Sequence, residues 1–104
     1  MPLPELPTSQ EEIDRRRAHR LAFGDVLRRA RADAGISQTV LADFAEVSRP
    51  TIARIENGTH SVSLDRLWAI SAALGVSAHE LIARTEHLAN DRLVAMRRSP
   101  SSTQ

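Results

Sequence analysis

The sequence predicts an all-α fold built from five short helices. Apolar residues recur at helical spacing from Phe23 to Ile82, and no useful stretch alternates with period two. The 104 residues leave room for one domain, and 41% of them are apolar. The only aromatic residues are Phe23, Phe44 and Trp68. The core is therefore expected to rest on Leu, Ile, Val and Ala, with Trp68 packed inside it.

The first predicted helix begins after Ser9, which forms a capping-box pattern with Glu12. Its apolar positions become regular from Phe23 onward, and Gly35 stands where a helix would end. Gly24 lies inside this pattern. An interior Gly costs about 1 kcal/mol relative to Ala, so the sequence leaves open whether the helix continues through Gly24 or breaks there.

Two short helices follow, separated by a turn of a few residues. Ser37 is a good N-cap for the first helix and Ser48 for the second. Pro50 is tolerated because the amides of a first turn have no intrahelical acceptor. The second helix is expected to end at Asn57 and Gly58. The first of the two helices carries Val40, Leu41 and Phe44, and the second is predicted to point Ile52 and Ile55 inward.

Two more helices complete the predicted domain. Apolar positions from Leu64 to Leu74 mark the fourth helix, closed by Gly75, and a second capping box at Ser77 and Glu80 opens the fifth. The chain is thus divided into an Arg-rich, partly helical N-terminal extension (1–20), a domain (21–83) and a C-terminal extension (84–104). The C-terminal extension is expected to hold a disordered tail at 99–104, with a sixth helix at 86–97 as an option.

The charge of the chain is unevenly distributed. The net charge is only +1, but residues 15–31 hold seven arginines against the single acid Asp25, a local balance of 7 − 1 = +6. Such a block suits contacts with nucleic-acid phosphates, although a solvated helix surface is the commoner explanation of a charge run alone.

Several function classes find no support in the sequence. Cysteine is absent, which excludes a disulfide framework and a thiolate metal site, and no apolar run approaches the roughly 20 residues of a membrane helix. There is no Gly-rich phosphate loop, and the four histidines are scattered. We therefore expect a cytoplasmic protein with no cofactor, no metal and no membrane contact, and not an enzyme.

Segment 37–57 carries the functional pattern. Two short helices that cross steeply need a small residue at their closest approach, and Ala42 supplies it. Apolar anchors stand on both sides of the turn at Leu41, Val47, Ile52 and Ile55. With these side chains inward, the outward side of the second helix carries Arg49, Thr51 and Arg54, a surface suited to the major groove of DNA.

Residues 21–83 resemble the lambda-repressor and Cro type of helix-turn-helix domain, the XRE family. The matching stretches are Gly-Ile-Ser-Gln (35–38), Leu-Ala (41–42), Val-Ser-Arg (47–49), Thr-Ile-Ala-Arg-Ile-Glu-Asn-Gly (51–58) and Ala-Leu-Gly-Val-Ser (73–77). Each piece is weak alone, but the ordered set is specific. The resemblance implies a five-helix lambda-repressor-like bundle that binds double-stranded DNA.

The resemblance also implies roles for individual residues. Gln38 would bind a phosphate and brace the recognition helix, Asn57 would approach another phosphate, and Arg31 with Glu56 would form a partly buried salt bridge. A guanidinium matches O6 and N7 of guanine, so Arg54 is the expected guanine reader. The complete predicted DNA-binding set is Gln38, Thr39, Arg49, Pro50, Thr51, Arg54, Asn57 and His60.

Three positions depart from the family pattern. Glu46 stands in the turn where the family often has Gly, and a left-handed non-Gly residue there costs roughly 1 kcal/mol. The loop from Thr59 to Ser63 offers only His60 where relatives often carry Lys or Arg, which leaves more of the phosphate affinity to the first helix. Pro50 removes an amide and a long polar side chain from a position that often reads bases.

The leading functional hypothesis is a transcriptional regulator, such as a repressor, that binds an inverted repeat as a homodimer. A phage repressor, a restriction-modification controller and an autoregulating antitoxin all fit the sequence. Apolar residues of the fifth helix and of 88–96 could form the dimer surface or belong to the core. The alternative hypothesis is a protein-interaction module such as an antitoxin, which holds a protein partner through its terminal extensions and for which DNA binding is secondary.

Overall fold

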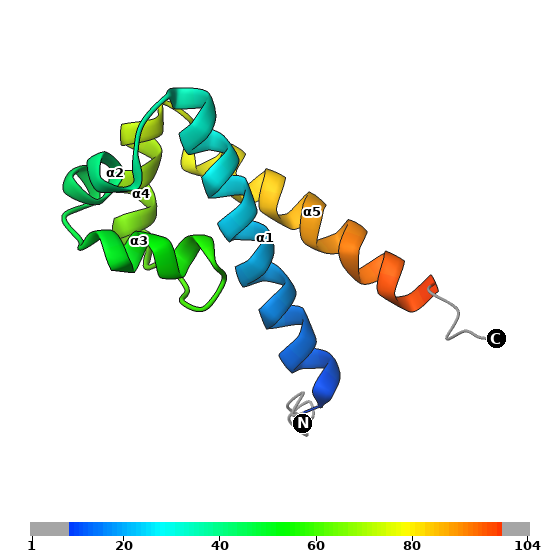
Figure 1. The fold of residues 1–104 in the computed structure, drawn as a ribbon. Helices are drawn as coiled ribbons and strands as arrows, with labels where there is room; N and C mark the ends of the chain where they lie inside the picture. Colours follow the sequence, from blue (N-terminus) through cyan, green and yellow to red (C-terminus); the bar gives the residue numbers. More distant parts are fainter. Residues whose placement is uncertain (1–8, 99–104) are drawn as a thin grey trace, which may run out of the picture.

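The part of the chain that the structure describes folds into five helices joined by short loops (Figure 1). A computed structural model describes residues 9–98, and no strand occurs in that range. The helices are α1 (Gln10–Ala34), α2 (Gln38–Ala45), α3 (Arg49–Glu56), α4 (Leu64–Leu74) and α5 (Ala78–Arg98). The all-α prediction is confirmed. The predicted tail at 99–104 lies outside the described residues.

Serine side chains begin most of the helices, as the sequence predicts. The hydroxyl oxygens of Ser37, Ser48 and Ser63 accept hydrogen bonds from amides three residues later, at 3.1–3.3 Å, and Ser77 does the same for α5 at 3.0 Å. These bonds satisfy amides that have no partner inside the helix. Ser9 is the N-cap of α1, but its side chain makes no capping hydrogen bond.

Helix α5 is longer than the sequence predicts, and α1 follows the unbroken course that the sequence left open. Helix α1 runs unbroken through Gly24, and α5 continues to Arg98, so the option of a separate sixth helix at 86–97 is wrong. No Gly or Pro interrupts the chain between Ile82 and Leu88, and nothing there stops the helix. Both helices therefore cross the boundaries expected at 20/21 and 83/84.

Helices α2, α3 and α4 form one side of the molecule, and α1 and α5 cross them and run out as an antiparallel pair (Figure 1). The two long helices diverge toward their outer ends. Ion pairs link them from Asp25 to Arg92 and from Glu11 to Arg97. The core at the junction consists of Val26, Leu27, Ala30, Leu41, Ala42, Ala45, Ile52, Ile55, Leu67, Ile70, Leu74 and Leu81.

Several large apolar residues, including Trp68, lie on the surface. Trp68 is 58% exposed, Phe44 63% and Leu64 64%, while Leu41 and Leu67 beside them are buried. The prediction that Trp68 packs inside is therefore wrong. Each helix presents apolar residues over a wider arc than its neighbours cover, and the small side chains Ala42 and Ala45 take the positions of closest approach instead.

Candidate DNA-binding surface

Helices α2 and α3 are held together by a tight turn. Ala42 and Ala45 of α2 are almost fully buried, and so are Ile52 and Ile55 on the inner face of α3. Glu46 makes the turn with φ 57° and ψ 44°, the one left-handed residue other than glycine in the described part of the chain. The turn therefore keeps the geometry that a Gly would adopt, at the conformational cost of a side chain.

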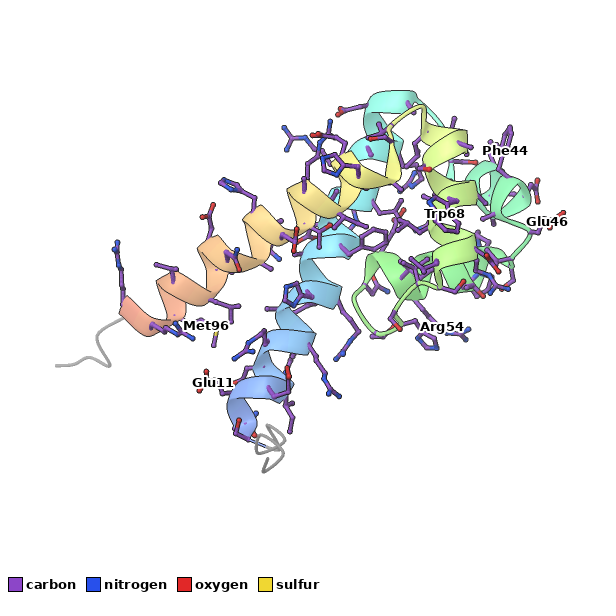
Figure 2. All side chains as sticks on the ribbon, turned by 180° about the vertical axis from the view of Figure 1, so that it is seen from behind. Glu11, Phe44, Glu46, Arg54, Trp68 and Met96 are labelled. Carbon is purple, nitrogen blue, oxygen red and sulfur yellow. The ribbon has the colours of Figure 1, made fainter. Side chains whose placement is uncertain are left out.

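The outer face of α3 is polar and open. Arg49, Pro50 and Arg54 are exposed, and Arg54 projects from the side of the domain opposite Phe44 (Figure 2). Thr51 is half-buried, and its hydroxyl lies 2.8 Å from the hydroxyl of the capping residue Ser48. The first turn of α3 thus presents an Arg and a short hydroxyl side chain on a rigid backbone, and its last turn presents a second Arg.

Gln38 connects α2 to both ends of α3. Its Oε1 accepts a hydrogen bond from Arg49 Nη1 at 3.1 Å, and its Nε2 donates to Glu56 Oε1 at 2.9 Å. Because the amide has partners on both sides, its rotamer is fixed and so is the direction of the Arg49 side chain. The side chain that leads α2 is therefore built into the support of the recognition helix.

Glu56 is a buried anion at the end of α3, with a side chain only 1% exposed. Arg31 binds it with two nitrogens, Nε at 2.7 Å and Nη2 at 3.1 Å, and Arg28 Nε lies 3.8 Å from it. The hydrogen bond to Glu56 raises the pKa of Arg31 above its ordinary value, against the opposing effect of burial. The salt bridge expected between Arg31 and Glu56 is therefore present, with Gln38 as a third partner of the carboxylate.

The carbonyl end of α3 rests directly on α1. A Cβ on Gly24 would lie 2.3 Å from the Glu56 carbonyl oxygen and 2.7 Å from that of Ile55, so only a glycine allows this approach. Arg28 Nη2 donates to the Glu56 carbonyl at 2.9 Å, and Arg20 Nε donates to the Gly58 carbonyl at 3.3 Å. Gly24 therefore does not break α1; it allows α1 and α3 to approach each other closely.

These roles of Gly24, Arg20 and Arg28 were not predicted from the sequence. The only local signal was a glycine inside a helical pattern, which often marks a packing contact. The partners lie 28 and 38 residues away along the chain for the two arginines. No periodicity could have paired them, because the contact depends on how α3 crosses α1.

The other predicted DNA-binding residues surround α3. Thr39 is exposed in the first turn of α2, Asn57 is the exposed C-cap of α3, and His60 is exposed in the loop that follows. His60 Nδ1 lies 3.4 Å from the hydroxyl of Thr59. The predicted set therefore lies along the two ends of α3 and the first turn of α2, on elements that are packed together.

Other kinds of site find no structural basis in the described part of the chain. Among residues 9–98, no group of three His, Asp or Glu side chains could hold a metal ion. None of the described helices is long and apolar enough to cross a membrane. Two open hollows of about 310 and 330 Å³ lie between the outer parts of α1 and α5, lined by residues such as Arg17, Leu93 and Met96.

The profile of the Helix-turn-helix family matches residues 27–81 of the chain, slightly more than half of it. The chain belongs to the Cro/C1-type helix-turn-helix family. It is accordingly a DNA-binding transcription regulator and not an enzyme. This Cro/C1-type regulator has the buried Ala42 and the polar outer face of α3 that the spacing within segment 37–57 predicted.

Two proteins similar in sequence to this Cro/C1-type regulator are named as control proteins. Control protein C.BamHI of Bacillus amyloliquefaciens is 42% identical over 64 residues, covering 61% of this chain and 79% of the relative. Control protein C.MunI of a Mycoplasma species is 35% identical over 68 residues, which are 64% of this chain and 92% of the relative.

Solved structures have the same fold. The clp gene regulator ClgR of Corynebacterium glutamicum superposes with a TM-score of 0.71 at 28% identity, covering 76% of this chain and 84% of the other. The restriction-modification controller protein C.AhdI of Aeromonas hydrophila gives 0.60 at 32% identity, over 62% and 94% of the two chains. The lambda-repressor-like architecture is therefore confirmed.

Proposed function

We propose that this regulator is a controller protein of the restriction-modification type, which binds an inverted DNA repeat as a homodimer. The observation that carries the proposal is the outward face of α3, with Arg49 and Arg54 exposed on a helix whose inner side is sealed. The similarity to C.BamHI, C.MunI and C.AhdI supports the controller class. Double-stranded DNA is the partner, no cofactor is required, and the site of action is the cytoplasm.

In the proposed complex, α3 lies in the major groove. Arg54 pairs with O6 and N7 of a guanine, and Arg49 and Thr51 contact base edges or nearby phosphates. Gln38 and Asn57 bind phosphates at the two ends of α3, and Thr39, Pro50 and His60 complete the surface. The buried pair Arg31 and Glu56 supports this surface and does not touch the DNA.

We expect a homodimer because the DNA sequence that one recognition helix can read is short. One helix reads only a few base pairs, and family members pair two modules about 34 Å apart on a palindrome. On α5, Leu81 and Ala89 are buried while Ile82, Val94 and Met96 are 41%, 44% and 61% exposed, and these exposed apolar side chains support a dimer surface on this helix. We place the second chain against these exposed side chains.

The proposal is tested by selecting bound fragments from a random DNA pool at about 0.15 M salt, followed by sequencing. We expect an inverted repeat with half-sites about one helical turn apart. Absence of any enriched sequence would refute site-specific binding and favour the protein-interaction alternative. The same selection with Arg54→Ala is expected to relax one base position.

Measured affinities for the selected site test whether Arg54 contacts the DNA or is only a solvent-exposed arginine. Arg54→Ala is expected to weaken binding by about 1–3 kcal/mol. Arg66 is the matched control, an exposed arginine on α4 outside the proposed surface, and Arg66→Ala should leave the affinity unchanged. Equal binding of wild type and Arg54→Ala to selected and random DNA would refute the assignment of the recognition surface.

A further inference from the structure

The structure divides the seven arginines of residues 15–31 into three groups. Arg20, Arg28 and Arg31 hold the end of α3, while Arg15 and Arg16 pair with Glu11 and Glu12 one turn earlier in α1. The remaining two, Arg17 and Arg29, make no ion pair or side-chain hydrogen bond with other residues in the described range. Both are exposed.

Arg17 lies on the side of α1 that faces α3. The residues of α1 that touch the end of α3 or its loop are spaced three or four apart, at Arg20, Gly24, Arg28 and Arg31. This is the spacing of one helix face, and Arg17 continues it three residues before Arg20. At 1.5 Å per residue, Arg17 stands about 4.5 Å farther along the helix axis.

Arg29 has a different position on the same helix. Five residues separate it from Gly24, a rotation of about 140° from the face that meets α3. The two unpaired arginines are therefore alike in type, exposure and helix, and differ in whether they flank the recognition helix.

The part of α1 before Arg20 projects beyond the loop that follows α3 (Figure 1). Arg20 and Leu21 contact Gly58 in that loop, next to Asn57 and His60. In the proposed complex this loop approaches the DNA backbone, so the next turn of α1 approaches it too. A long Arg side chain on that turn can reach a phosphate oxygen.

Charged side chains of both signs lie near Arg17. Arg92 lines the same hollow from α5 and Asp14 lines it from α1, and Arg16, the residue before Arg17, is exposed. Of the nearby acids, Asp14 accepts a hydrogen bond from Gln10. Asp25, about two turns further along α1, is bound by Arg28 and Arg92. Asp25 is thus neutralised by arginines, whereas Asp14 keeps its negative charge because the Gln10 amide is neutral. Arg17 forms no ion pair with either carboxylate, so its guanidinium is available to an anion from outside the chain.

We propose that the amino-terminal part of α1 is a second DNA contact, in which Arg17 binds a backbone phosphate beside the carboxyl end of the recognition helix. This inference rests on the proposed function and extends it beyond the residues matched by the family, which begin at 27. The contact adds affinity without reading sequence, because phosphates carry no base identity. It supplies the basic charge that the loop from Thr59 to Ser63 lacks.

The test compares the salt dependence of DNA binding by the full-length wild type, Arg17→Ala and Arg29→Ala. Affinities are measured on two duplexes, one with the selected inverted repeat and one of random sequence. Each phosphate contact contributes about 0.9 to the slope of log affinity against log salt. Arg17→Ala should reduce the magnitude of the slope by about 0.9 per bound chain on both duplexes. A fourfold rise in salt should therefore weaken DNA binding by the variant about 3- to 4-fold less, per chain, than it weakens binding by the wild type.

Arg29→Ala should keep the wild-type slope, and the repeat selected by Arg17→Ala should be the wild-type repeat. Wild-type slopes for both variants would overturn the α1 contact, while a loss of specificity in Arg54→Ala would still uphold the proposed function. Equal reductions in both variants would also overturn it, because the effect would then be one of net charge. If no repeat is selected, the salt dependence on the random duplex still tests the Arg17 contact. If the wild type binds neither duplex, both proposals are refuted.

Discussion

Replacing Gly24 by Ala tests the contact that places the recognition helix. In a solvent-exposed helix this change stabilises by about 0.8–1.0 kcal/mol, because Ala has the higher helix propensity. Here the new Cβ would lie 2.3 Å from the Glu56 carbonyl oxygen and 2.8 Å from its carbonyl carbon. Ordinary contact begins at 3.4 Å, so α1 and α3 must separate by about 1 Å (3.4 − 2.3).

This separation costs more than the propensity gain. Overpacking of this kind costs about 1–3 kcal/mol. Moving α3 away also stretches the hydrogen bonds from Arg28 to the Glu56 carbonyl (2.9 Å) and from Arg20 to the Gly58 carbonyl (3.3 Å). Charged hydrogen bonds contribute about 1.5–3 kcal/mol when fully formed, and we expect only part of that to be lost. The net expectation is a destabilisation of about 2 kcal/mol.

Urea and thermal unfolding followed by circular dichroism measure this difference, and the expected fall in Tm is about 10 °C for a domain of this size. Gly35→Ala is the matched control, since no atom lies within 4 Å of its added Cβ and only its φ of 70° opposes the change. That variant should lose about 1 kcal/mol. A Gly24→Ala protein as stable as wild type, or more stable, would refute the steric argument.

Three further substitutions test other parts of the fold by the same unfolding measurements. Glu46→Gly should stabilise the chain by up to about 1 kcal/mol, because the turn already has φ 57°; a loss of stability would contradict this. Arg31→Ala should cost about 3–5 kcal/mol by leaving Glu56 buried without its main partner, and a cost below 1 kcal/mol would show that Arg28 and Gln38 suffice. Trp68→Ala should cost less than the roughly 2–5 kcal/mol of Leu67→Ala, since Trp68 is 58% exposed and Leu67 4%; the reverse order would place Trp68 in the core.

Much of the fold could be predicted because its signals are local. A serine hydroxyl that caps a helix binds an amide three residues away, so Ser37, Ser48, Ser63 and Ser77 mark helix starts in the sequence itself. The alternation of buried and exposed residues along α3 is likewise a property of one helix. The outward placement of Arg49 and Arg54 therefore followed from the positions of Ile52 and Ile55.

The sequence by itself determined the helices, their caps and the outer face of α3, because each depends on residues within one or two turns. Only the tertiary structure decided which apolar residues are buried, since Phe44 and Trp68 satisfy helical spacing as well as Leu41 and Leu67 do. It also decided that α1 continues through Gly24 and touches α3 there. These outcomes depend on the angle and distance at which helices cross, which are set by packing between segments distant in the sequence.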